Sequence, residues 1–587
     1  YMVPNFYMRL ESFPLTINGK LDRKALPKMK VSKKEYVAPT TASQKMISQI
    51  WQEALQQDLI GIEDNFFEQG GSSITSMTVA FLLSKQFNKN IPLKEIFEYP
   101  TIKQLDLRIH NIQDSNIIIP KVSGESFALS FAQQRLLFIE LFEGHTNAYH
   151  IPLLIQLSKE VDTNALSLAL KALIQRHSML RTEYKQNEDG SLHQFIVNKE
   201  PEIIYRNCDS NKELQLYLDK DINTPFDLMN EIPVRIVFYS NNKSNLLLFN
   251  IHHISVDGWS LDIISNDLLE YYKHYADKKE LSLEPIDIEY KDFAVWKRQY
   301  LSGSILDKQL NYWKDKLSGF ETIELPLDKE RPNKLDFKGK DIYFTFDKDL
   351  SLQLKRLSTA NNTTLYNILL AGFFILLNKY TQKNDLLIGT PYASRDVEQL
   401  QNIVGFFINN LIFRQIIDTN KTVAELVNAI RNNFIEMQHY QDTPFDEIVS
   451  NIDMEKDTSR HPIFQVMFSV QQFKVKNSKE MKKYFQLQNI SDIYKVAKFD
   501  LTCLIDDSDD EIAGVINYAT SLLEEDTINR FINHYKNILE QIVSDYDFKK
   551  INQYNVLDKA EHNQLVNLWN QTDKPFPQNK TIHQLFE

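Results

Sequence analysis

Apolar residues follow two different periods along the chain, and the change falls near residue 127. Within residues 40–112 they recur at helical spacing, and Thr41 followed by Gln44 has the spacing of a capping box. The helix that begins there carries apolar residues on one face, namely Ile47, Ile50, Trp51, Ala54 and Leu55. A second helix is expected from Ser73, with an inner face of Ile74, Met77, Phe81 and Leu82. With a last short helix from Thr101 to Leu107, the pattern predicts a small helical bundle.

From Phe127 to about Val566, strand and helix patterns alternate, which predicts a layered α/β architecture. This section is long for one domain, so we expect two lobes that share a cleft, divided between Trp296 and Pro332. The most apolar stretch, Leu365–Leu377, is interrupted by Asn367 and is too short to cross a bilayer. We therefore interpret it as a buried helix.

Length, charge and cysteine content narrow the class of protein. A chain of 587 residues is expected to form several domains, and its net charge of −12 argues against a nucleic-acid partner. Cys208 and Cys503 have no paired spacing, which favours neither a disulfide framework nor a metal site and suits a reducing cytoplasm. No signal peptide or membrane span is recognisable, so we expect a cytoplasmic protein without a membrane partner. Both ends look cut, and we expect a piece of a longer polypeptide.

Ser73 follows Gly70-Gly71 at the start of the second predicted helix. The simplest interpretation of such a serine is a helix cap. However, the glycines allow a tight turn, and the helix end offers free N–H groups and a positive dipole that favour a phosphate. Ser73 is thus a reasonable site for a phosphodiester-linked group, and Ser72 is the better candidate for a plain cap.

The surrounding residues resemble the peptidyl carrier protein signature of non-ribosomal peptide synthetases: Asp64, Phe66, Phe67, Gly70, Gly71, Ser73 and Ile74. The resemblance implies that a phosphopantetheinyl transferase attaches 4'-phosphopantetheine to Ser73. The thiol of this phosphopantetheine arm then holds an aminoacyl or peptidyl group as a thioester. The segment Pro14–Lys24 resembles the last motif of an adenylation domain, with Lys20 at the lysine that contacts the adenylate. The segments 568–570 and 581–587 resemble the entrance to a following adenylation domain.

A second candidate site is His252-His253, four residues before Asp257-Gly258. Residues 245–251 have the pattern of a strand, and alternate strand residues point to opposite faces, so one histidine is expected to face a channel. Two core histidines would be the ordinary interpretation of a bare pair. The turn at Asp257-Gly258 argues for a shaped loop instead, with Ser260 capping the helix that follows.

This motif resembles that of condensation domains, and further segments fall in the order of that family: 130–136, 176–182, 290–296, 388–395, 405–409, 441–445 and 459–465. Ser178 and Ser394 replace the usual Glu and Gly. The resemblance implies a two-lobed fold of the chloramphenicol acetyltransferase superfamily with a tunnel between the lobes. The implied organisation is an adenylation remnant (1–35), a four-helix-bundle carrier domain (36–112), a linker (113–126), a condensation domain (127–566, lobes about 127–296 and 297–566) and the start of the next adenylation domain (567–587).

The implied reaction is attack of an α-amine, on a downstream acceptor carrier, upon a thioester held on Ser73. His253 is expected either to accept the proton or to position the amine, with His252 beside it. Asp257 is expected to pair with an arginine, for which Arg395 and Arg181 are candidates, and Arg135 is a further supporting residue. Amides around Gly258 are candidates for stabilising the oxyanion. Epimerisation and a non-catalytic, carrier-recruiting domain remain alternatives, whereas cyclisation is disfavoured because cyclising relatives replace the histidine motif with paired aspartates.

Overall fold

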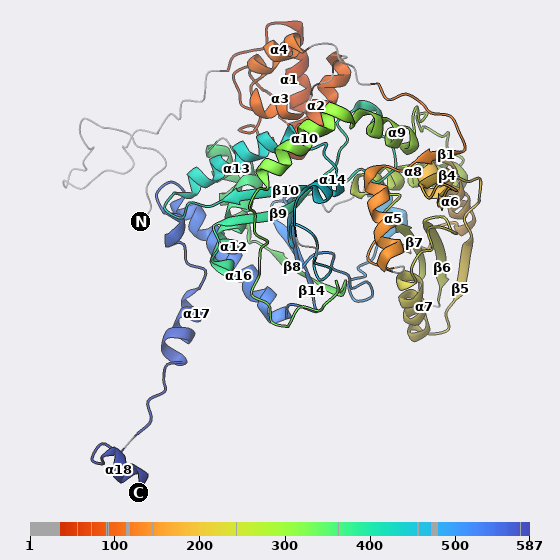
Figure 1. Cartoon of the computed structure of the whole chain (residues 1–587). Helices are drawn as coiled ribbons and strands as arrows, with labels where there is room; N and C mark the ends of the chain where they lie inside the picture. Colours follow the sequence, from red (N-terminus) through yellow and green to blue (C-terminus); the bar gives the residue numbers. More distant parts are fainter. Residues whose placement is uncertain are drawn as a thin grey trace, which may run out of the picture.

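The computed structural model describes residues 36–55, 57–71, 73–87, 89, 91, 93–112, 118–143, 146–241, 244–361, 363–454, 457–470, 479–575 and 577–587, without the side chains of 73, 74, 77, 81, 85, 93, 94 and 479. Predictions for residues 1–35, for Ser72 and for most of the linker therefore lie outside the described residues. A small helical domain (36–112) sits against one end of a larger, two-lobed domain, and the chain leaves that domain through an extended C-terminal segment (Figure 1).

The helical domain contains four helices, α1 (Ala42–Leu55), α2 (Ser73–Phe87), α3 (Leu93–Glu98) and α4 (Ile102–Asn111). The predicted capping box is confirmed, because Thr41 Oγ1 accepts the Gln44 amide at 3.0 Å while the Gln44 side chain returns to the Thr41 amide. Core residues from all parts of the domain surround Trp51, whose ring lies 4.9 Å from that of Phe66. On α2 the side chains of Ile74, Met77 and Phe81 lie outside the described residues, so the predicted inner face stays a prediction; among the described residues, Val79, Ala80 and Leu83 fill the core and Leu82 is half-buried.

The first lobe is built on a five-stranded sheet in the order β12 (Phe485–Leu487), β2 (His150–Leu157), β7 (Asn245–His252), β6 (Val234–Ser240) and β5 (Ile203–Asn207). All neighbours are antiparallel except β5 and β6. α6 (Thr163–Arg176) and α8 (Gly258–Asp277) pack on one face, and α7 (Asn211–Asn223) packs on the other. A smaller sheet of β1 (Ser126–Ala128), β4 (Leu192–Ile196) and β3 (Thr182–Gln186) lies beside α5 (Phe131–Glu143).

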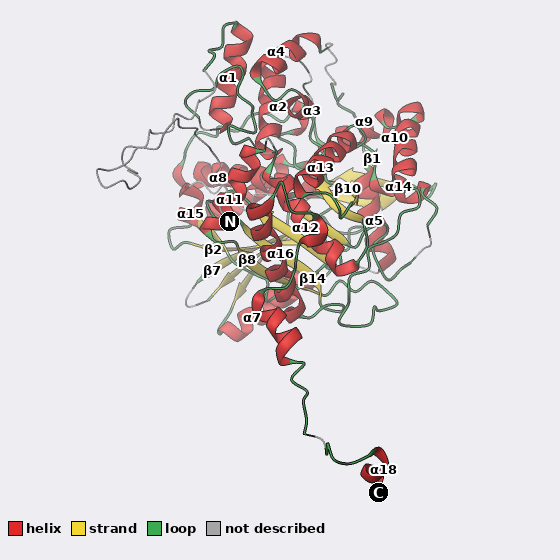
Figure 2. Cartoon of the chain, turned by 90° about the vertical axis from the view of Figure 1, so that its left-hand side faces the viewer, coloured by secondary structure: helices red, strands yellow, loops and turns green. Residues whose placement is uncertain are grey.

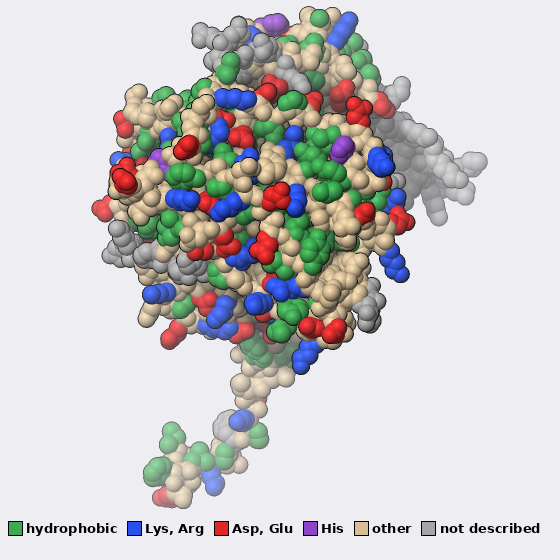
Figure 3. Space-filling view, turned by 90° about the vertical axis from the view of Figure 1, so that its right-hand side faces the viewer, with side chains coloured by type: hydrophobic (Ala, Val, Ile, Leu, Met, Phe, Trp, Pro, Cys, Tyr) green, Lys and Arg blue, Asp and Glu red, His purple; other side chains and the backbone are tan. Residues whose placement is uncertain are grey.

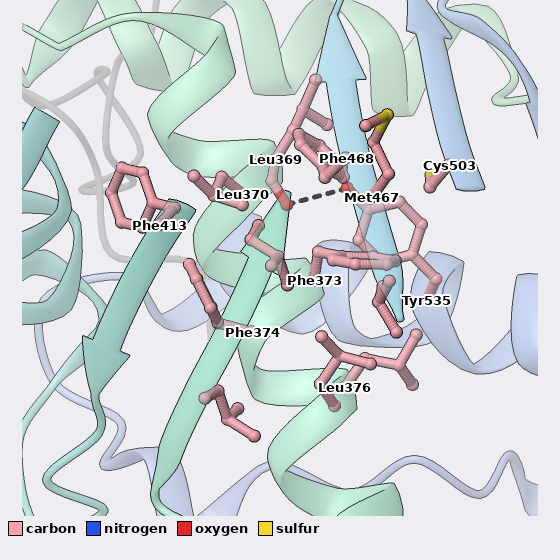
Figure 4. Packing of buried hydrophobic residues seen from close by; sticks show 14 of the residues in the cluster. Leu369, Leu370, Phe373, Phe374, Leu376, Phe413, Met467, Phe468, Cys503 and Tyr535 are labelled. Carbon is pink, nitrogen blue, oxygen red and sulfur yellow. Dashed lines mark hydrogen bonds between the residues drawn. The ribbon is translucent and has the colours of Figure 1, made fainter. Parts of the chain in front are cut away.

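The second lobe is built on a six-stranded sheet in the order β10 (Asn409–Ile416), β9 (Asp385–Tyr392), β11 (Val466–Val470), β13 (Leu501–Asp506), β14 (Ala513–Ala519) and β8 (Gly339–Thr345). Helices α11 (Lys348–Ala360), α12 (Leu365–Thr381), α13 (Val423–Gln438) and α16 (Glu525–Asp545) contribute to its core. The predicted buried helix is α12, and Figure 4 shows its Leu370, Phe373 and Phe374 beside Phe413 of β10 and Phe468 of β11. Tyr535 of α16 donates a hydrogen bond to the Leu369 carbonyl of α12 at 2.8 Å. The layered α/β prediction is confirmed.

Two segments from the later part of the chain join the first lobe, which the predicted division at residue 296 missed. Residues 485–487, late in the chain, form β12 on the edge of the first lobe's sheet, preceded by α15 (Lys479–Tyr484). Residues 397–408, with the turn η2 (Glu398–Leu400), pack back onto the first lobe's core. At Gly405 a Cβ atom would lie 2.0 Å from the Tyr290 ring, so only glycine permits this close approach. The lobes are therefore tied at two places beyond the direct chain connection.

The remaining helices are α9 (Tyr290–Tyr300), α10 (Gly303–Lys316), α14 (Phe445–Asn451), α17 (Lys559–Asn563) and α18 (Ile582–Phe586). Figure 2 shows the helices of the second lobe in front of its strands, with the C-terminal segment extending away. On the face in Figure 3, basic and acidic side chains are interspersed and neither sign dominates. No single described helix has the length and apolar character to span a membrane, although α11 and α12, which meet at a sharp bend, pass together on those criteria. The described residues hold no cluster of three His, Cys, Asp or Glu side chains suited to a metal.

Candidate active site

The two adjacent histidines lie where β7 leaves the first lobe's sheet, and they face different surroundings. His252 ends the strand and is fully buried; its Nδ1 accepts the Ile254 amide at 3.1 Å, and its Nε2 lies 3.2 Å from Glu140 Oε1. His253 is half-buried and lines a cavity. The prediction that one histidine of the pair faces a channel is confirmed, and His252 supports the strand end from behind.

The His253 imidazole is fixed in one orientation and one tautomer. Its Nδ1 lies 2.7 Å from the Val256 carbonyl oxygen, which can only accept, so Nδ1 carries the proton and Nε2 keeps a free lone pair. Its backbone amide donates to the Tyr149 carbonyl at 2.8 Å. Burial and the positive charge of Lys498 lower the pKa of His253 to about 3. The ring is therefore neutral at physiological pH and offers a hydrogen-bond acceptor.

The cavity beside His253 is lined by both lobes, is partly open to solvent and has a volume of about 200 Å³. The first lobe contributes Tyr149 and Tyr290, and the second lobe contributes Asn409, Phe445 and Phe499. Most of the wall is aromatic or aliphatic. A largely apolar lining of this kind lowers the local dielectric and strengthens the electrostatic interactions beside it.

Asp257 binds the loop of the histidine motif to the second lobe. Its carboxylate caps α8 by accepting the Ser260 amide at 2.8 Å, and it pairs with Arg395 Nη2 at 3.2 and 3.3 Å. It also accepts the Phe407 amide at 3.2 Å, while Ser260 Oγ donates to the Gly405 carbonyl at 2.9 Å. The predicted pair of Asp257 with Arg395 is confirmed. The prediction that Ser260 caps the helix was wrong, because Asp257 is the cap and Ser260 lies one turn inside.

The structure also places the other residues predicted for this site. Arg181 does not reach Asp257; it lies immediately before β3, and its guanidinium donates to the carbonyls of Val197 and Gln175. Gly258 is exposed at the first turn of α8 and does not line the described cavity, and the expected role of the amides around it in stabilising an oxyanion stays a prediction. Arg135, predicted as a supporting residue, lines the cavity itself and donates to His461 Nε2 at 2.9 Å.

Sequence reasoning missed three residues on the cavity wall. Lys498 comes from the segment before β13, and His461 is a second neutral imidazole whose Nδ1 lies 2.9 Å from the Pro462 carbonyl. Ser394 adopts a left-handed backbone with φ of 43°, which explains why glycine suits this position more easily. His461 and Ser394 lie within the motifs that carry the family resemblance, whereas Lys498 lies outside all of them.

Comparison with known families agrees with this geometry. The family model of the condensation domain matches residues 124–566. The chain belongs to the condensation-domain family. The model of the phosphopantetheine attachment site matches residues 46–105, so the helical domain is a phosphopantetheine carrier that precedes the condensation domain.

Similar curated proteins are synthases of gramicidin S, surfactin and bacitracin. The chain is 33% identical over 599 residues to gramicidin S synthase 2 of Brevibacillus brevis, covering 100% of the chain and 13% of that protein. It is 30% identical to surfactin synthase subunit 1 of Bacillus subtilis (strain 168), covering 100% of the chain and 16% of that protein. It is 31% identical to bacitracin synthase 3 of Bacillus licheniformis, covering 100% of the chain and 9% of that protein. The chain thus spans only a small part of these relatives.

Solved structures share the fold of the condensation domain. The X-domain from teicoplanin biosynthesis matches with a TM-score of 0.67 and 22% identity, covering 75% of this chain and 99% of that one. A four-domain nonribosomal peptide synthetase bound to AMP and glycine matches with a TM-score of 0.66 and 22% identity, covering 76% of this chain and 35% of that one. These matches support the two-lobed fold predicted from the sequence.

Replacement of Asp257 by Asn should destabilise the condensation domain, because the change leaves the buried Arg395 guanidinium without its counter-charge. Breaking a buried ion pair in this way costs about 3–5 kcal/mol. Urea unfolding of Asp257→Asn measures this loss. The double variant Asp257→Asn with Arg395→Met is the control and should lose less than the two single changes added together. An unchanged unfolding midpoint in Asp257→Asn would contradict the bracing role.

Four histidines with lowered pKa values should make the folded state less stable as the pH falls. Burial lowers the pKa of His150, His252, His253 and His461 to about 3, whereas an unfolded imidazole titrates near 6.5. Below about pH 6.5 the unfolded chain therefore binds more protons, and the free energy of unfolding decreases toward pH 3. NMR of the His253 ring, assigned with His253→Gln, should show no inflection between pH 5 and 8 in the folded protein but a normal one in urea. An inflection in the folded protein would contradict the assignment of a neutral ring.

Proposed function

We propose that this chain forms a peptide bond in non-ribosomal synthesis by transferring an acyl group from phosphopantetheine on Ser73 to the α-amine of an aminoacyl thioester on a downstream carrier. The observation that carries the proposal is the His253 imidazole, held neutral with Nε2 free, on the wall of a cavity that both lobes line. A domain that only recruited or spaced other proteins would need neither the fixed tautomer nor an apolar cavity beside it.

The chemistry requires a C–N bond to form and a C–S bond to break. The acceptor amine attacks the donor thioester carbon, and the nitrogen of the resulting tetrahedral intermediate loses one proton. The intermediate then expels the phosphopantetheine thiolate, which takes up a proton and becomes the free thiol. An α-amine has a pKa of about 7.7–8.0, so a useful fraction is unprotonated at neutral pH before attack.

His253 fits the role of positioning the amine and accepting its proton late. With a pKa of about 3, the ring is a poor base toward a ground-state ammonium. Its Nε2 can accept a hydrogen bond from the neutral amine and so hold the nitrogen in line with the thioester carbon. Once the C–N bond forms, the nitrogen is positively charged and more acidic, so transfer of its proton to His253 costs less than transfer from the ground-state ammonium.

Contacts between the two domains support the carrier as donor to the condensation domain of its own chain. The Phe97 ring of α3 lies 6.2 Å from the Phe434 ring of α13, and His439 Nε2 lies 3.9 Å from Glu98 Oε1. Ala80 and Ser84 of α2 also border a small gap against residues 392–401. Ser73 begins α2, so it lies about 10 Å along the helix axis from Ala80.

The gap beneath the carrier adjoins the cavity that contains His253. Ser394 lines both spaces, the gap on one side and the cavity on the other. An arm that extends from the carrier along this wall would enter the cavity from the carrier's side. The acceptor carrier, which needs its own access to His253, would then belong to a later part of the synthetase.

The wider system follows from the domain order. We propose that the carrier occupies residues 36–112 and the condensation domain 127–566, between an adenylation remnant at 1–35 and the next adenylation domain from 567. A phosphopantetheinyl transferase would modify Ser73, and adenylation domains would load the carriers. Such an assembly would work in the cytoplasm, where coenzyme A and ATP are available.

Modification should occur on Ser73 alone. Incubation of the full chain with coenzyme A and a phosphopantetheinyl transferase should add one phosphopantetheine by intact-mass measurement. Ser73→Ala should abolish the addition because the acceptor hydroxyl is gone. Ser72→Ala is the matched control and should be labelled like the natural protein. Labelling of Ser73→Ala, or loss of labelling in Ser72→Ala, would refute the assignment.

Loss of the His253 imidazole should slow peptide-bond formation. The chain loaded with an aminoacyl group, mixed with a loaded acceptor carrier, should yield a dipeptidyl thioester. His253→Ala and His253→Gln should lower its rate by about 10²- to 10⁴-fold, the usual contribution of a proton-transfer group.

The same assay distinguishes the alternatives. Full activity of both His253 variants would show that the imidazole is dispensable. If the natural chain made no peptide but exchanged the α-hydrogen of the loaded residue with deuterium, epimerisation would replace the proposal. Mass spectrometry of the thioesters detects both outcomes.

A further inference from the structure

The cavity beside His253 contains a lysine whose charge is not balanced by any described residue. Two other cations on the wall have carboxylate partners: Arg135 Nε lies 3.6 Å from Asp446, and Lys297 is ion-paired with Asp442. Lys498 has no hydrogen-bond or ion-pair partner within the described part of the chain. Its Nζ instead lies 4.9 Å from the centre of the Tyr149 ring. An unpaired ammonium in an apolar cavity costs free energy. Its presence there therefore points to a function.

The backbone around Lys498 is firmly held. Val496 forms a bridge with Lys338, and the Ala497 amide donates to the Phe337 carbonyl at 2.8 Å. The next residue, Phe499, packs with its ring 4.7 Å from that of His461. The Lys498 side chain therefore leaves a rigid segment, which is the kind of support that a catalytic group needs.

Tyr149 connects Lys498 directly to His253. The ammonium from the second lobe lies over the Tyr149 ring, and the carbonyl of the same residue accepts the His253 amide at 2.8 Å. The segment that carries Lys498 also contacts the start of β2, the strand that follows Tyr149, because the Tyr494 hydroxyl donates to the His150 carbonyl at 3.0 Å. The contact between the two lobes thus places the Lys498 ammonium, a hydrogen-bond donor, and the neutral His253 imidazole, a hydrogen-bond acceptor, in one cavity.

We propose that the Lys498 ammonium donates a hydrogen bond to the donor thioester's carbonyl oxygen and stabilises the negative charge that develops there during amine attack. The inference rests on the proposed peptide-bond formation and names the group that its tetrahedral intermediate needs.

The electron and proton balance is simple. As the C–N bond forms, the carbonyl π electrons move onto oxygen, which Lys498 meets with an N–H donor while keeping its proton. His253 takes the proton from nitrogen. When the oxyanion electrons re-form the carbonyl, the C–S bond breaks, and the proton on His253 passes to the departing thiolate. No further reactant is required.

Charged and titratable groups around Lys498 come from both lobes. Burial, followed by the charge of Arg135, lowers the pKa of Lys498 to about 8. On the cavity side the lysine shares its surroundings with Tyr149, Arg135, His253, His461 and Asp446. On its other side a narrow recess contains Arg331, Asp336 and Asp500. Arg331 donates to Asp500 at 3.0 Å, and the Lys338 amide donates to Asp336 at 3.0 Å, so both carboxylates in the recess are already engaged.

The test is Lys498→Met in the dipeptide assay with the loaded full chain. Removal of one oxyanion donor lowers kcat by about 10²- to 10³-fold, and the KM for the acceptor carrier should stay unchanged. Lys498→Arg should keep most of the rate. Because the natural lysine loses its proton near pH 8, the rate of the natural chain should fall above that pH, and the fall should be absent in Lys498→Arg. The exposed Lys495→Met, three residues earlier on the same segment, is the matched control and should behave like the natural chain.

The outcomes distinguish a failure of the inference from a failure of the proposed function. A natural chain that makes peptide while Lys498→Met matches its kcat would overturn the lysine's role alone. So would a defect confined to aspartyl or glutamyl donors, with alanyl donors unaffected, because the lysine would then recognise an acidic side chain. A large loss of thermal stability in Lys498→Met would indicate a structural role and also overturn the inference. If the natural chain itself makes no peptide, the proposed function fails first.

Discussion

The buried carboxylate of Asp257 holds the active-site region together. It is at once the cap of α8, the partner of Arg395 and the acceptor for the Phe407 amide, so one side chain joins the histidine loop of the first lobe to a returning loop of the second. A carboxylate this deeply buried is tolerated only when it is paired and hydrogen-bonded, and here the Ser260 amide, the Phe407 amide and the Arg395 guanidinium all donate to it. Motion of the returning loop away from α8 would leave charges unpaired on both sides.

The position of the cavity follows from this connection. The lobes meet where the returning loop 397–408 lies against α8 and Tyr290, and the cavity opens next to that contact, with His253 on its wall. The Tyr290 hydroxyl donates to the Phe406 carbonyl and is hydrogen-bonded to the Ser130 hydroxyl at 2.8 Å. These bonds fix Tyr290, Phe406 and Ser130, which line the same cavity as His253. A reaction between two tethered substrates benefits from such rigidity, because small displacements of reacting groups lower the rate strongly.

Much of this arrangement could be predicted from local sequence. The strand before His252-His253 and the buried helix α12 follow from apolar periodicity, and the capping box at Thr41 follows from residue type and spacing. The exchange of segments between lobes could not be predicted, because β12 is three residues long and its pairing with β2 depends on contacts distant in sequence. The same limit applies to Arg181 and Arg395: both are arginines in family motifs, and only the packing of the second lobe decides which one meets Asp257. Lys498 lies in no recognised motif, and its importance appears only when the lobes are brought together.

One physical cause accounts for the chemistry of both His253 and Lys498. The apolar cavity disfavours positive charge, so it lowers the pKa of the imidazole and of the ammonium alike. The imidazole is thereby kept free to accept, while the ammonium stays charged near neutral pH because its ordinary value is so much higher. A protonated His253 beside a protonated Lys498 would be doubly unfavourable, so a proton accepted from the amine has a strong tendency to leave again. The departing thiolate is the natural acceptor, and its formation also removes the oxyanion that the lysine stabilised. The enclosure therefore favours passage through the charged intermediate and disfavours remaining in it.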